Sequence, residues 1–82
     1  MKSKNEINNL SLSDQYEMIS SKGKYIGVRI YYNYTINLYL LNDVFYELWY
    51  FRPTNVIESI DILEDEKTLN LYIDYAKKHH QT

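Results

Sequence analysis

The sequence predicts a single α+β domain in which a four-stranded antiparallel meander sheet has an N-terminal and a C-terminal helix packed on one face. Apolar residues recur every three to four positions near both ends of the chain, and at every second position through its middle. Short turn sequences separate the alternating segments, and connections of that length join antiparallel neighbours. A chain of 82 residues has room for one domain, 1–82, with one sheet and one layer of helix.

The N-terminal helix is predicted over residues 11–21, where apolar side chains fall on one helical face. Ser11, Ser13 and Asp14 are candidates for its N-cap, because short polar side chains accept the backbone hydrogen bonds that a helix start leaves unmade. Gly23 is predicted to end the helix. The polar segment before it, residues 1–10, is either a loose arm or the first turns of a helix.

Four strands follow, predicted over residues 24–33, 35–41, 44–51 and 56–63. Asn42 and Asp43 form a turn pair that tolerates left-handed backbone angles, and Pro53 fixes the entry to the last hairpin turn. The C-terminal helix begins at an acidic segment and ends near His79, where basic residues complement the helix dipole.

Aromatic residues are the most distinctive feature of the chain, which contains ten Tyr, two Phe and one Trp. In the segment 44–51, seven of eight positions are apolar or aromatic, although a half-buried strand alternates apolar with polar residues. This pattern indicates a central strand that is covered on both faces. With both helices on one face, the other face is predicted to be either a semi-exposed tyrosine surface or an interface. The candidate binding residues are Tyr31, Tyr39, Phe45, Glu47, Trp49 and Phe51.

Glu47 lies in the middle of the most apolar strand. It is predicted either to pair with Arg29, which lies inside another strand, or to face water. A general acid or base role, with Glu58 as a second carboxylate, is the less favoured interpretation, because a small domain has little room for a catalytic cleft.

Other chemistry is disfavoured by composition. The chain has no cysteine, which excludes disulfides and Cys-ligated metal and favours a cytoplasmic location. His79 and His80 are adjacent on a helix and therefore point about 100° apart, a poor geometry for a metal site. With two glycines and no nucleophile motif, the chain is not predicted to be an enzyme or to bind a cofactor. We expect neither a signal peptide nor a membrane span.

The charge balance of nine basic and eleven acidic residues, with net charge −2, disfavours a nucleic-acid partner on electrostatic grounds. The high content of Asn, Ile, Lys and Tyr suggests an AT-rich bacterium or phage as the source. We therefore expect a non-catalytic interaction module, of the accessory, inhibitor or immunity type, that binds another protein or itself through an aromatic sheet face or edge. The alternative is a small-molecule-binding domain with an aromatic ligand on the tyrosine-rich face.

Overall fold

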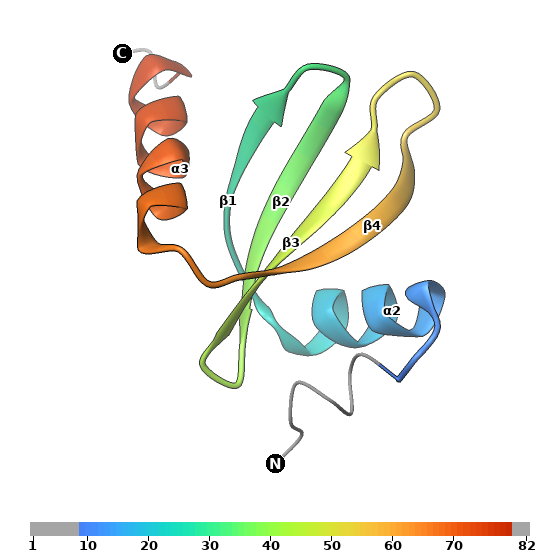
Figure 1. Ribbon diagram of the computed structural model, residues 1–82. Helices are drawn as coiled ribbons and strands as arrows, with labels where there is room; N and C mark the ends of the chain where they lie inside the picture. The colour runs from blue at the N-terminus through green and yellow to red at the C-terminus, as the bar shows by residue number, and fades with distance from the viewer. Residues whose placement is uncertain (1–8, 80–82) are drawn as a thin grey trace.

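The computed structural model describes residues 9–79, so most of the predicted arm over 1–10, and His80, lie outside the described residues. Figure 1 shows the elements in the order α2 (Leu12–Lys22), β1 (Lys24–Tyr31), β2 (Tyr34–Leu41), β3 (Val44–Phe51), β4 (Val56–Leu63) and α3 (Glu66–His79). The four strands form one open antiparallel sheet in the order β1-β2-β3-β4. The predicted α+β class and the four-stranded antiparallel meander sheet are confirmed. No described helix is both long and apolar enough to cross a membrane.

The hairpin turns place four residues in the left-handed region: Tyr32, Asn42, Asp43 and Asn55. At the turn between β2 and β3, Asn42 and Asp43 both have positive φ, as the favoured two-residue hairpin turn requires. The sequence predicted that the first strand reaches residue 33. It ends at Tyr31 instead, because Tyr32 turns the chain with φ 52°.

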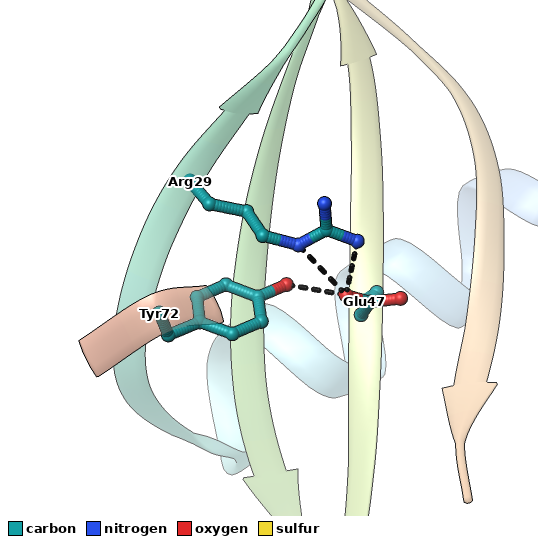
Figure 2. Close-up of polar contacts among 3 residues, drawn as sticks. All are labelled: Arg29, Glu47 and Tyr72. Atoms are coloured by element: carbon teal, nitrogen blue, oxygen red, sulfur yellow. Dashed lines mark hydrogen bonds and ion pairs between the residues drawn. The ribbon is translucent and has the colours of Figure 1, made fainter. Parts of the chain in front are cut away.

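The two helices cover opposite faces of the sheet, whereas the sequence predicted both on one face. Ile19 of α2 packs in a buried cluster with Tyr46, and Tyr72 of α3 packs in a second cluster with Leu38. Leu38 pairs directly with Glu47, the strand neighbour of Tyr46. Because successive side chains of a strand point to opposite faces, the two clusters lie on different sides of the sheet. In Figure 2, Tyr72 lies in front of the strands and the pale blue α2 lies behind them.

The physical reason for this correction lies in β3, which is apolar on both faces. Tyr46 and Leu48 are buried beneath α2, and Phe45 and Trp49 pack against the cluster beneath α3. Placing both helices on one side would leave the other apolar row in water. The chain therefore supplies its own cover for each face, and a partner is not required there.

The end of α2 depends on a close approach at Gly23. Ser11 is the N-cap, with its Oγ accepting from the backbone N–H of Asp14 at 3.1 Å. Gly23 follows the last helical residue, as predicted, but its backbone is extended, with φ −82° and ψ 167°. A Cβ at this position would lie 2.6 Å from the carbonyl oxygen of Ile19, so glycine is required by space and not by a left-handed angle.

Candidate functional site

Five of the six predicted binding residues share the face of the sheet that α3 covers. These are Tyr31, Phe45, Glu47, Trp49 and Phe51. The sixth, Tyr39, pairs with Tyr46 and packs on the α2 side. The predicted single aromatic face is therefore divided between the two sides of the sheet.

Glu47 is the centre of a buried polar network, drawn in Figure 2, that joins α3 to the sheet. Its Oε2 atom accepts from Arg29 Nη2 at 3.0 Å and from the Tyr72 hydroxyl at 2.6 Å. Arg29 on β1 reaches across β2 to make this contact with β3. The side chains of Arg29 and Glu47 are 12% and 7% exposed, so little water competes for the ion pair. The predicted Glu47–Arg29 pair is confirmed.

The electrostatics of this network favour a charged Arg29 beside a neutral Tyr72. Burial, followed by the hydrogen bond to Glu47, raises the pKa of Tyr72. Burial acts to lower the pKa of Arg29, but the hydrogen bonds from its guanidinium outweigh burial, so the pKa is raised overall. The guanidinium also lies 5.4 Å from the ring centroid of Tyr72 and 5.7 Å from that of Trp49, within cation–π range. Oε2 of Glu47 thus holds both Arg29 of β1 and Tyr72 of α3.

Glu58, the second carboxylate considered from the sequence, also makes a hydrogen bond within the chain. Glu58 on β4 accepts from the hydroxyl of Tyr34 at 3.0 Å, and this hydrogen bond raises the pKa of Tyr34. Within residues 9–79, no three His, Cys, Asp or Glu side chains come together as they would in a metal site.

Near the β1–β2 turn, the face of the sheet that α3 covers carries a continuous aromatic cluster. Tyr34 lies 5.4 Å from Trp49 and 5.7 Å from Phe51, measured between ring centroids, and Tyr31 lies 6.0 Å from Trp49. The rings therefore pack against one another in the tilted and edge-to-face geometries that aromatic pairs prefer. At its rim, Tyr32 is 80% exposed and its ring lies 4.6 Å from that of Tyr31. A bulky residue with positive φ is a strained one, so the hairpin tip is held at an energetic cost.

Two hollows lie beside α3, and β1 forms a wall of both. The first, which we call the apolar hollow, has a volume of about 650 Å³. It is lined by Tyr25, Ile26, Gly27 and Val28 of β1, by Leu38 and Phe45, and by Leu69, Tyr72, Ile73, Tyr75 and Ala76 of α3. It borders the first half of β1.

The second, which we call the basic hollow, has a volume of about 760 Å³ and borders the second half of β1. It is lined by Arg29, Ile30, Tyr31, Arg52, Leu71, Asp74, Tyr75 and Lys78. Three of these side chains are cationic and one is anionic, although the whole chain has net charge −2. The structure thus gathers basic residues that are dispersed in the sequence.

Exposed apolar side chains concentrate along β1 and α3. On β1, the exposed fractions are 52% for Tyr25, 43% for Ile26, 36% for Ile30 and 49% for Tyr31. On α3, Leu71 and Ile73 are 47% and 51% exposed. Ile26 is the extra residue of a β-bulge and has no register partner on β2.

The opposite edge of the sheet differs in character. Strand β4 exposes Glu58 and Asp61 at its centre and also contains a bulge opposite β3. Both edge strands contain a bulge, so the two edges differ in charge: acidic side chains at the centre of an edge strand oppose pairing with another chain. Of the charged residues on β1, Arg29 is withdrawn into the ion pair with Glu47, which leaves Lys24 at the start of the strand.

Sequence reasoning missed the residues that α3 and the β3–β4 turn contribute to these hollows. Leu71, Tyr75 and Arg52 were not predicted to belong to a site. A signal for the first two was present: they are apolar, yet they fall outside the helical face that contains Leu69 and Tyr72. No local signal points to Arg52, because only the folded hairpins bring it beside β1.

Comparison of the chain with models of protein families, with curated proteins and with solved structures gave no match.

Proposed function

We propose that this protein is a non-catalytic interaction module that binds a partner protein along strand β1, in the angle between that edge of the sheet and helix α3. The observation that supports it most is the contrast between the two sheet edges: β1 exposes four apolar side chains along its length, whereas β4 exposes one, Val56, at its start and two acidic side chains, Glu58 and Asp61, at its centre. With no cysteine in the chain, we expect it to act in the cytoplasm.

Strand β1 leaves both apolar side chains and one edge of its backbone available to a partner. An edge strand presents a row of backbone donors and acceptors, and partners commonly add a strand to such an edge while their side chains enter neighbouring pockets. Here the two hollows stand beside the edge along its whole length. Exposed aromatic residues such as Tyr25 and Tyr31 are enriched at protein interfaces and often dominate the binding energy.

The apolar hollow favours a second candidate function, the binding of a small apolar or aromatic molecule. Its volume of about 650 Å³ falls within the range of known ligand pockets. If that function holds, small aromatic fragments raise the melting temperature of the protein, and filling the hollow with Ala76→Trp abolishes that rise.

A matched pair of edge substitutions tests the interaction function. Ile26→Lys on β1 and Val56→Lys on β4 each replace an exposed apolar residue with the same cation, at 43% and 55% exposure. Proteins captured from a bacterial lysate are quantified for the unmodified chain and both variants. We expect Ile26→Lys to lose the captured partner and Val56→Lys to retain it. Equal capture by all three would contradict a role for the β1 edge.

A further inference from the structure

We infer that the segment bound along β1 is an extended peptide that places a carboxylate in the basic hollow and apolar side chains beside the apolar hollow. This inference rests on the proposed function and adds to it the chemistry of the partner.

Charged side chains surround the basic hollow. Arg29, Arg52 and Lys78 line it, and Asp74 with the buried Glu47 offsets two of these charges. The hollow therefore keeps a net positive charge within a protein whose net charge is −2. A local surplus opposite in sign to the rest of the chain attracts an acidic group and repels a basic one.

Arg52 lies at the basic hollow beside the end of β1. It is exposed in the β3–β4 turn, where its Nη1 donates to the carbonyl oxygen of Tyr32 over a long 3.5 Å. Its backbone N–H donates to Asn33 at 2.7 Å, which anchors the residue. A guanidinium has five N–H donors arranged as a planar fork that matches a carboxylate. Arg52 thus has donors to spare at a fixed site beside the end of β1.

The two hollows follow one another along β1. Tyr25 to Val28 border the apolar hollow, and Arg29 to Tyr31 border the basic hollow. The eight residues of β1 span about 26 Å at the usual rise per residue. A peptide of similar length that pairs with β1 therefore meets apolar surface at one end and cationic surface at the other.

A second copy of this chain fits less well than an acidic peptide. In a two-fold antiparallel contact between two β1 strands, the start of one strand faces the end of the other. Lys24 of one copy would then approach the basic hollow of its neighbour, and β1 contains no acidic residue to compensate. Like charges brought together in this way oppose association.

Selection from a random octapeptide library displayed on phage tests the inference, with the whole chain as the target. The unmodified protein, Arg52→Glu and the control Lys67→Glu are used in parallel. Lys67 is exposed at the start of α3 and lines neither hollow, so its substitution makes the same change in net charge elsewhere. We expect peptides with an acidic residue beside alternating apolar residues from the unmodified protein and from Lys67→Glu, and loss of the acidic preference with Arg52→Glu.

The strongest selected peptide is then synthesised, and its affinity is measured by fluorescence anisotropy. We expect Arg52→Glu to weaken binding by about tenfold or more, equivalent to about 1.4 kcal/mol, and Lys67→Glu to change it less than about twofold. Peptides that lose affinity with Ile26→Lys but show no acidic preference would overturn this inference and leave the proposed function standing. A dimer in light scattering that Ile26→Lys dissociates would do the same. No selected peptide together with a monomeric protein would overturn both.

Discussion

Removal of Glu47 should destabilise the fold far more than removal of both members of its ion pair. In Glu47→Met, the guanidinium of Arg29 stays almost buried, at 12% exposure, without its counter-ion. Breaking a buried pair on one side costs about 3–5 kcal/mol, because the remaining charge is uncompensated. Arg29→Met should cost a similar amount for the same reason. An apolar replacement of both partners removes the unpaired charge and is often close to neutral.

In the double variant Arg29→Met/Glu47→Met, the remaining loss of stability comes from Tyr72. Its hydroxyl donates to Glu47 Oε2 at 2.6 Å and loses that acceptor when Glu47 is replaced. An unsatisfied buried hydroxyl costs about 1–3 kcal/mol, so the variant with Met at positions 29 and 47 should be destabilised by about that amount. Adding Tyr72→Phe should then cost almost nothing, although Tyr72→Phe alone should cost about 1.5–3 kcal/mol as the loss of a hydrogen bond to a charged group.

Urea unfolding followed by the fluorescence of Trp49 measures these free energies. Trp49 is the single tryptophan of the chain and lies 5.7 Å from the guanidinium of Arg29, so it reports on this region. The slope of the free energy against urea should stay constant across the variants. A cost for Glu47→Met below about 1 kcal/mol, or single costs that simply add in the double variant, would refute the argument that the network is buried and coupled.

Three further predictions follow from individual positions. Gly23→Ala should destabilise the protein by about 1–3 kcal/mol, because its Cβ would lie 2.6 Å from the carbonyl oxygen of Ile19. Gly27→Ala is the control and should be tolerated, because the nearest atom to its new Cβ is 3.8 Å away. The urea midpoints of the two variants test the difference. Tyr32→Gly should raise the free energy of unfolding by about 1 kcal/mol by relieving the positive φ, and an unchanged or lower value would count against strain at that turn. Burial, with Tyr16 nearby, raises the pKa of Tyr50 to about 12. The contribution of Tyr50 to stability is therefore fully present below about pH 10 and is lost as the pH rises towards 12. Tyr50→Phe should flatten that decline in urea unfolding measured from pH 9 to 12.

The alternation of apolar residues predicted the strands, and the short turns between them predicted the meander order. The pair Asn42-Asp43 and the acidic start of α3 are local signals, and they are found where they were predicted. The Glu47–Arg29 pair was also predictable, because a lone carboxylate in an apolar strand needs a cation and the strands offered only one inside a neighbouring pattern.

The placement of the helices could not be predicted in the same way. The apolar character of β3 on both faces correctly indicated that both need cover. Which helix covers which face depends on contacts, such as those between α3 and β1, that no local pattern records. Because α3 covers the second face, the apolar side chains that stay exposed lie mainly along the β1 edge and on α3 itself. The basic hollow arises only in three dimensions, when the turn that holds Arg52 meets the end of β1 and the last turns of α3.

Amide chemical-shift changes on binding provide the most direct test that β1 is the docking edge. A ¹H–¹⁵N spectrum of the protein, with and without a peptide selected by the unmodified chain, reports on every strand at once. We predict that the largest changes occur in β1 and along α3, with β4 little affected. Changes centred on β4 or on α2, with β1 unperturbed, would contradict the account.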